Sequence, residues 1–187
     1  MKIISITGKS GSGKSTLTNL LAKKLKCTSI DVDRIGHKAT SDEKISQKLC
    51  EIFGNEILNE TKKVDRKKLG NIVFSDKKKM DILTDITWGY MQEMLDEILE
   101  KEKGNTIILE WALLPISKYW KKSNVKILIK AEDEERKSKV IERDKISEEY
   151  FLKRDAGGID YTPFEFDYIF ENDYNLETMQ KIVNTIK

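Results

Sequence analysis

Short runs of β-branched and aliphatic residues alternate along the chain with longer segments whose apolar residues recur every three or four positions. The runs Lys2–Thr7, Ser29–Val32, Thr106–Trp111 and Val125–Ala131 are typical of buried strands, and Phe166–Phe170 is a weaker fifth. Helical spacing of leucines follows the first run. Strands that alternate with helices predict an α/β fold of three layers, with a parallel sheet covered on both faces.

Two segments between the predicted strands have a helical pattern and no strand pattern. Residues 65–104 carry an apolar stripe at helical spacing, and residues 133–155 are charged and end before the glycines at 157 and 158. Thr40 with Glu43 three positions later predicts a capping box at the start of another helix, which should end at Gly54.

The first predicted strand leads directly into a phosphate-binding motif. Residues 8–15 match GxxxxGK[ST] at every fixed position. Glycines let the backbone wrap around a phosphate, and the following helix adds the positive end of its dipole. Lys14 can then reach the β- and γ-phosphates while the Ser15 hydroxyl binds Mg²⁺. We therefore predict an ATP site with Mg²⁺ whose nucleotide-binding residues are Gly8, Gly11, Ser12, Gly13, Lys14, Ser15 and Thr16.

Composition narrows the class of protein further. The net charge of +2 comes from 34 basic and 32 acidic side chains, which is typical of a mixed solvated surface and disfavours a nucleic-acid partner. No apolar run approaches the length of a membrane span, and the two cysteines are isolated, so we expect a cytoplasmic protein without membrane association. The base-reading NKxD motif of GTPases is absent, which favours a kinase.

Beyond the loop, the string Ile30–Ile35 (IDVDRI) resembles the IDAD segment of dephospho-coenzyme A kinases. The resemblance continues through Val64–Arg66, Val73–Asp76, Glu142–Asp144 and Asp167–Asn172. These fragments follow the family's order over nearly the whole chain, and the common order is more specific than any one fragment.

This resemblance implies a reaction and a division of the chain. The reaction is transfer of the ATP γ-phosphate to the 3′-hydroxyl of dephospho-CoA. The expected parts are a core (residues 1–59, 104–131 and 159–187), a helical acceptor-binding part (60–103) and a lid (132–158). The sequence does not indicate an oligomeric state.

The resemblance also suggests roles outside the loop. Asp33 follows the second predicted strand and is the candidate base for the acceptor hydroxyl, although an aspartate there could instead cap the next helix. Asp31 is the alternative, on the same face if the strand extends that far. Arg143 occupies the family's lid position, with Arg154 a second lid cation and Arg136 an alternative.

Three further residues complete the predicted site. Arg66 would bind the acceptor and Asn172 the adenine, although asparagine before Asp173 is equally typical of a turn. Glu110, where the family has aspartate, would organise Mg²⁺ through water or have only a structural partner. The only histidine, His37, is predicted to lie on a helix surface.

Departures from the family pattern concentrate on the acceptor side and the lid. They are Trp88, Gly89, Ala112, Ile116 and Gly158. Two alternatives therefore stay open at this point: a nucleoside or nucleotide kinase on the same fold, and a non-catalytic paralogue that binds nucleotide or CoA.

Overall fold

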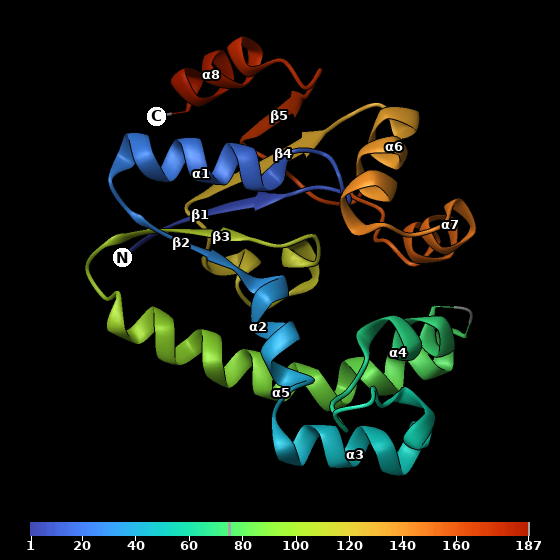
Figure 1. The fold of residues 1–187 in the computed structure, drawn as a ribbon. Coiled ribbons are helices and arrows are strands. Elements are labelled where there is room, and N and C mark those ends of the chain that lie inside the picture. The colour runs from blue at the N-terminus through green and yellow to red at the C-terminus, as the bar shows by residue number, and fades with distance from the viewer. Residues whose placement is uncertain (75, 187) are drawn as a thin grey trace. The chain divides into compact units, whose positions relative to one another are not determined.

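The structure is a computed structural model, and it describes residues 1–74 and 76–186. The chain divides into two compact units (Figure 1). The sheet unit contains residues 1–31 and residue 102 onward, and the helical unit contains residues 32–101. Ser75, one residue of the family-like fragment Val73–Asp76, lies outside the described residues.

Five parallel strands form the sheet in the order β2-β3-β1-β4-β5. They are β1 (Lys2–Thr7), β2 (Thr28–Asp31), β3 (Thr106–Glu110), β4 (Val125–Lys130) and β5 (Tyr168–Glu171). Each predicted run overlaps one of these strands, although β2 begins one residue earlier than expected and β5 is shifted to Tyr168–Glu171. The predicted α/β class with a parallel sheet is confirmed.

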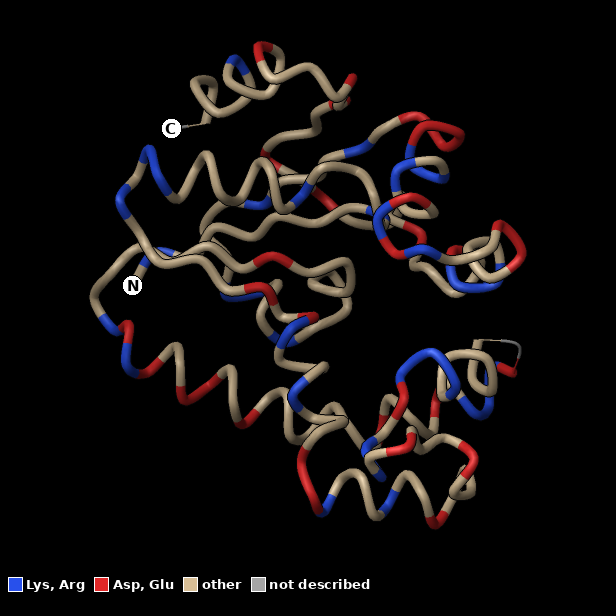
Figure 2. The backbone as a smooth tube through the Cα atoms, in the orientation of Figure 1, with Lys and Arg blue, Asp and Glu red and all other residues tan. Residues whose placement is uncertain are grey.

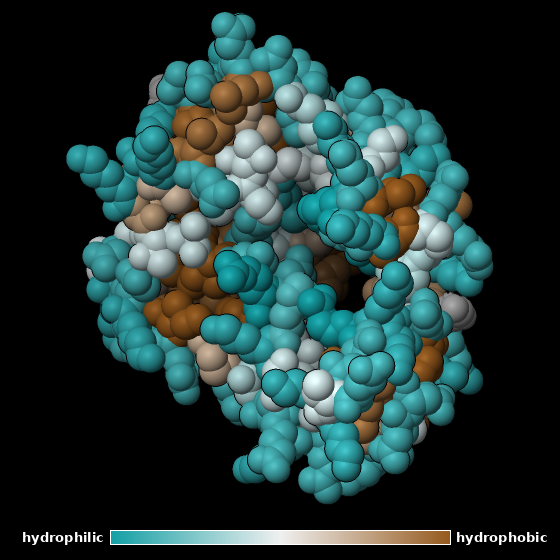
Figure 3. All heavy atoms as spheres, in the orientation of Figure 1, coloured by the Kyte–Doolittle hydropathy of each residue, from teal (hydrophilic) through white to brown (hydrophobic). Residues whose placement is uncertain are grey.

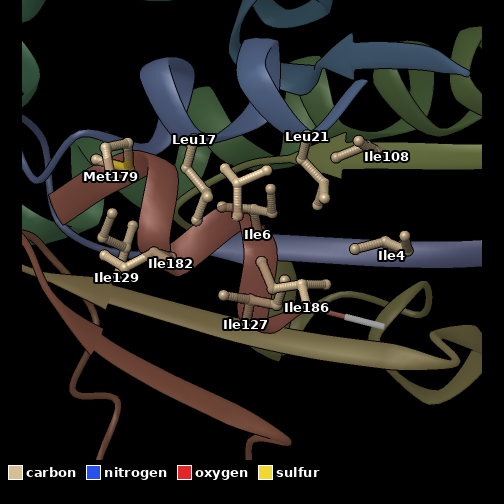
Figure 4. Close-up of a cluster of buried hydrophobic side chains, with 11 residues drawn as sticks. Ile4, Ile6, Leu17, Leu21, Ile108, Ile127, Ile129, Met179, Ile182 and Ile186 are labelled. Carbon is tan, nitrogen blue, oxygen red and sulfur yellow. The ribbon is translucent and has the colours of Figure 1, made fainter. Parts of the chain in front are cut away.

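The sheet unit contains four α-helices and two 3₁₀ turns among its described residues. They are α1 (Lys14–Leu25), η2 (Leu114–Ile116), η3 (Trp120–Lys122), α6 (Asp133–Asp144), α7 (Glu148–Ala156) and α8 (Leu176–Thr185). Leu17 and Leu21 of α1 meet Ile182 of α8 and Ile4 and Ile6 of β1 in one buried cluster (Figure 4). Helices α1 and α8 therefore cover the same face of the sheet.

The opposite face is covered by the segment that follows β3. Side chains alternate along a strand, so Ser5 faces away from the cluster that contains Ile4 and Ile6. The Ser5 hydroxyl lies 2.6 Å from the Ser123 hydroxyl, within hydrogen-bonding distance. The sheet is thus covered on both faces, as the alternating pattern predicted.

The described residues of the helical unit form four α-helices and one 3₁₀ turn. They are α2 (Val32–Ala39), α3 (Glu43–Phe53), η1 (Asn55–Ile57), α4 (Arg66–Val73) and α5 (Lys77–Lys101). Leu49, Phe53, Ile57, Leu69 and Val73 form its buried core. This unit extends beyond the predicted residues 60–103 because α2 and α3 both pack against α5.

Two predicted helix boundaries were wrong. Asp42, and not Thr40, caps α3, since its carboxylate accepts hydrogen bonds from the N–H groups of Lys44 and Ile45, both at 3.1 Å. The Thr40 hydroxyl donates to the His37 carbonyl at 2.9 Å and so belongs to the end of α2. The charged segment 133–155 is two helices, because Lys145 takes a left-handed conformation with φ of 50° between them.

The many charged residues lie on the surface in mixed order. Figure 2 shows Lys and Arg interspersed with Asp and Glu along α6 and α7. In the space-filling view most of the visible surface is hydrophilic, with hydrophobic residues gathered in small patches (Figure 3). Within the described ranges, no helix combines the length and the apolar character that a membrane span requires.

Candidate functional site: a phosphate loop braced by two helices

The loop between β1 and α1 follows a path that requires glycine, and the tightest positions are Gly8 and Gly13. Gly8 has φ of 150°, and a Cβ there would lie 2.1 Å from the Ile129 carbonyl oxygen. Gly13, at the start of α1, has φ of 95°, and its Cβ would lie 2.3 Å from Asn172 Nδ2. Larger residues would push the loop away from β4 and β5. The glycines at these two positions are therefore required by close packing against neighbouring segments of the chain.

Two donors of the loop converge on one carbonyl. Lys14 is buried, with 8% of its surface exposed, and its Nζ donates to the Lys9 carbonyl at 3.0 Å. The Ser12 N–H donates to the same oxygen at 3.2 Å. The Ser12 hydroxyl is fully buried and has no hydrogen-bond partner among the described residues. An anion at this loop would meet a cation, N–H groups and the start of α1.

Ser15 and Glu110, the two predicted metal ligands, are in direct contact. The Ser15 hydroxyl donates to Glu110 Oε1 at 2.5 Å. Glu110 ends β3 with 6% of its surface exposed, and it pairs in register with Asp31, the last residue of β2. Burial raises the pKa of Glu110, an effect that the Ser15 hydrogen bond and the Lys14 charge oppose.

The oxygen atoms of Ser15 and Glu110 suit a hard cation. Mg²⁺ is usually held by one or two carboxylates together with substrate phosphates and water, so the pair fits Mg²⁺ without a larger protein cage. No group of three or more His, Cys, Asp or Glu that could hold a metal ion occurs in residues 1–74 and 76–186.

Asn172 and Tyr174 support the loop from the end of β5. Asn172 Nδ2 donates to the Ser12 carbonyl at 3.0 Å, and its Oδ1 accepts from the Tyr174 N–H at 3.0 Å. The Tyr174 hydroxyl donates to the Gly11 carbonyl at 2.9 Å. Asn172 is buried, and both ends of its amide are engaged by the chain. A contact with adenine stays a prediction.

Arg136 joins α6 to the loop and to α7. Its side chain is 2% exposed, and all five guanidinium donors are used. Nη1 donates to the Ser10 carbonyl at 2.8 Å, and further donors reach the carboxylates of Asp133 and Asp155 at 2.7–3.0 Å. An arginine held in this way is a structural brace, so the interpretation of Arg136 as an alternative mobile lid cation is not supported.

The other two candidate lid arginines share one carboxylate. Arg143 Nε donates to Asp144 Oδ1 at 2.7 Å, and Arg154 Nη1 donates to Asp144 Oδ2 at 2.9 Å. The hydrogen bond from Arg143 is the main reason that the pKa of Asp144 is lowered. Arg154 Nη2 also lies 3.4 Å from the Ser10 hydroxyl, so the structure places Arg154 directly beside the phosphate loop.

Sequence reasoning missed the partners that organise these arginines. Asp144 is ten positions from Arg154, and Asp155 is nineteen positions from Arg136. Such separations leave no periodic signal, because the pairs form between two helices. Lys9 was missed for the same reason, with its ammonium 3.9 Å from the Asp155 carboxylate.

The predicted acceptor residues occupy different elements. Asp31 ends β2, whereas Asp33 lies in the first turn of α2 and is exposed. The strand does not extend to Asp33, so the expected common strand face of the two aspartates does not exist. Arg66 begins α4, and its guanidinium contacts His37 Nε2. His37 is exposed on α2, as predicted, but this contact was not foreseen.

Comparison with known proteins agrees with this arrangement. The family model of dephospho-CoA kinase matches residues 2–161. A dephospho-CoA kinase from Leptospira interrogans is 33% identical over 183 residues, covering 96% of this chain and 88% of that protein. Among solved structures, a Thermus thermophilus protein superimposes with a TM-score of 0.79 at 26% identity, covering 99% of this chain and 95% of that one.

A second solved structure carries the family's name. Dephospho-CoA kinase from Campylobacter jejuni superimposes with a TM-score of 0.61 at 27% identity, with coverage of 99% of this chain and 95% of that one. The family match includes the phosphate loop, the helical unit and the two helices that brace the loop. The chain therefore belongs to the dephospho-CoA kinase family.

Proposed function

We propose that the chain transfers the γ-phosphate of Mg·ATP to the 3′-hydroxyl of dephospho-CoA, giving coenzyme A. The observation that carries this proposal is the family match over residues 2–161, which spans the phosphate loop and the entire helical unit. A match confined to the loop would support nucleotide binding alone, because many protein classes share that motif.

The nucleotide side of the reaction uses residues of the sheet unit. Lys14 exchanges its hydrogen bond with the Lys9 carbonyl for the β- and γ-phosphates, and the N–H groups at the start of α1 bind the same anion. Ser15 would hold Mg²⁺ through its hydroxyl, and Glu110 would act on the cation through water. Bound there, Mg²⁺ would supply positive charge that offsets the charge of the transferred phosphoryl group.

Asp33 acts on the acceptor hydroxyl in this proposal. It lies in the first turn of α2, near the positive N-terminal end of the helix. An ionised carboxylate can accept the hydroxyl proton or orient the hydroxyl for attack. Arg154 and Arg143 contribute cations that stabilise the charge of the transferred group, with Arg154 closer to the loop.

The test is an assay of purified protein with Mg·ATP and either dephospho-CoA or a panel of nucleosides and nucleotides, with products identified by mass spectrometry. We expect 3′-phosphorylated product only from dephospho-CoA. Turnover confined to nucleosides would support the alternative kinase instead, and nucleotide binding without turnover would support the non-catalytic paralogue.

Matched variants separate a chemical defect from a general loss of charge. Lys14→Met should abolish turnover, whereas Lys23→Met, which removes an exposed lysine from the same helix, should not. Asp33→Asn should lower kcat by about 10²–10⁴-fold, a typical range for general base catalysis. Asp81→Asn, an exposed aspartate of α5, is its control. Full activity of Asp33→Asn would remove Asp33 from the mechanism.

A further inference from the structure

Helix α2 has one buried face and one charged face. Val32, Ile35 and Ala39 are buried, and a Cβ at Gly36 would lie 3.2 Å from Met91 Sδ of α5. Arg34, His37 and Lys38, at spacings of three and four residues, occupy the exposed face. Packing against α5 therefore fixes which side chains of α2 meet solvent, and Figure 2 marks the Lys and Arg positions in blue.

The charged face lines a cavity that lies wholly within the helical unit. Its volume is about 450 Å³, and it is lined by Arg34, His37, Lys38, Ser41, Asp42 and Tyr90. The only acidic side chain in this lining is Asp42, and one of its carboxylate oxygens caps α3 through two backbone N–H groups. Arg34 and Lys38 are four residues apart on the helix, a spacing at which like charges repel. The cavity is therefore suited to a ligand with negative charge.

Arg66 adds a third cation close to the cavity, through its contact with His37. The guanidinium of Arg66 contacts His37 Nε2. A guanidinium can only donate hydrogen bonds, so His37 accepts at Nε2 and carries its proton on Nδ1. This contact links Arg66 of α4 to the cavity wall. Arg34 and Lys38 line the cavity, and Arg66 lies behind the His37 side chain, which favours an anion with more than one negative charge.

The cavity lies beside the candidate base on the same helix. Asp33 and His37 are four residues apart, so they lie on one face, separated by about 6 Å along the helix axis. In dephospho-CoA the 3′-hydroxyl and the 5′-diphosphate are carried by the same ribose, separated by a few covalent bonds. A ribose placed with its 3′-hydroxyl at Asp33 can therefore place its diphosphate in the cavity.

We propose that this cavity binds the diphosphate group of the acceptor. The assignment rests on the proposed function, because dephospho-CoA supplies the diphosphate. In this role Arg34 and Lys38 bind the phosphoryl oxygens directly, and the His37–Arg66 pair adds positive charge at the wall. The site thereby distinguishes acceptors with a diphosphate from free nucleosides.

The test compares two ligands of the acceptor site in one variant. Lys38→Met should raise KM for dephospho-CoA about tenfold, the usual effect of losing one charge-assisted hydrogen bond, with little change in kcat or in KM for ATP. Adenosine lacks the diphosphate and is measured as a competitive inhibitor against dephospho-CoA. Its inhibition constant should be the same in the variant and in the unmodified chain.

Lys48→Met is the matched control, because it removes an exposed lysine of α3 that does not line the cavity. If Lys38→Met loses equal affinity for dephospho-CoA and adenosine, or loses affinity for neither, the assignment of the cavity is overturned. Turnover of dephospho-CoA by the unmodified chain would still support the proposed function in that case. Absence of dephospho-CoA turnover by the unmodified chain would overturn the proposed function and the assignment together.

Discussion

Arg136 and Asp155 form a two-pronged ion pair between α6 and α7, with Nη1–Oδ1 and Nη2–Oδ2 distances of 3.0 Å each. The same guanidinium donates to the Ser10 carbonyl, so one buried side chain connects the two helices to the phosphate loop. Paired geometry of this kind is among the stronger polar contacts in proteins, particularly when the arginine is removed from water.

Replacing Arg136 by methionine should destabilise the sheet unit and impair the loop. The variant keeps most of the buried side-chain volume but leaves Asp155 and the Ser10 carbonyl without this donor, at a cost of about 2–4 kcal/mol in the free energy of unfolding. Urea unfolding measures the loss. Arg143→Met is the comparison, because Arg143 is 60% exposed and its pair with Asp144 should contribute less than about 1 kcal/mol. Equal decreases in the free energy of unfolding of the two variants would contradict the role of Arg136 as a structural brace.

Two glycine substitutions should have opposite effects. Gly13→Ala forces a side chain into a backbone with φ of 95° and within 2.3 Å of Asn172 Nδ2, so both stability and ATP affinity should fall. Gly89→Ala lies inside α5, where an added Cβ meets no atom within 4 Å, and should stabilise the chain by about 0.5–1 kcal/mol. Thermal unfolding and ATP titration calorimetry measure these effects. A stable Gly13→Ala variant with normal ATP affinity would refute the steric argument.

The sheet could be predicted from sequence because β1, β3 and β4 are short runs rich in isoleucine, leucine and valine. The phosphate loop could also be predicted, because one local motif specifies its residues, and Lys14 lies where the motif requires it. Both signals are contained within a few consecutive residues, and neither depends on how distant segments pack.

The braces of the site could not be predicted, because they join distant segments. Nothing near Arg136 indicates that its partners are Ser10 and Asp155, and nothing near His37 indicates Arg66.

The helix start at Asp42 was missed for a different reason. Thr40 and Asp42 are both good capping residues, and only the end of α2 decides between them.

The anchoring of α6 restricts which part of the predicted lid, residues 132–158, responds to nucleotide. Arg136 belongs to α6 and donates directly to the loop, whereas α7 is joined to the loop through the side chains of Asp155 and Arg154 and follows a left-handed turn at Lys145. We expect Mg·ATP to slow amide hydrogen exchange in residues 148–156 more than in residues 133–144. Mass spectrometry of peptides from the two helices makes the comparison, and Lys14→Met with the same nucleotide is the control. Equal slowing in both helices would show that they close together.

Glu110 should give the chain a specific dependence of stability on pH. Burial raises the pKa of this carboxyl above its ordinary value of 4.5, so the folded chain binds the proton more tightly than the unfolded chain does. The stability that the protonated carboxyl contributes is therefore complete below pH 4.5 and is lost as the pH rises through the raised pKa. Glu110→Gln has no such titration.

The free energy of unfolding of Glu110→Gln relative to the unmodified chain should therefore increase from pH 4.5 upward. Urea unfolding at several pH values, followed by the fluorescence of the buried Trp111 and Trp120, measures this difference. Glu97→Gln, on the exposed face of α5, controls for the loss of one negative charge. The same Glu110→Gln variant should need more Mg²⁺ for turnover, because an amide orients the cation's water less well than a carboxylate. The opposite result is a difference in the free energy of unfolding, Glu110→Gln minus unmodified chain, that decreases as the pH rises. It would show that Lys14 and Ser15 stabilise the Glu110 anion by more than burial destabilises it.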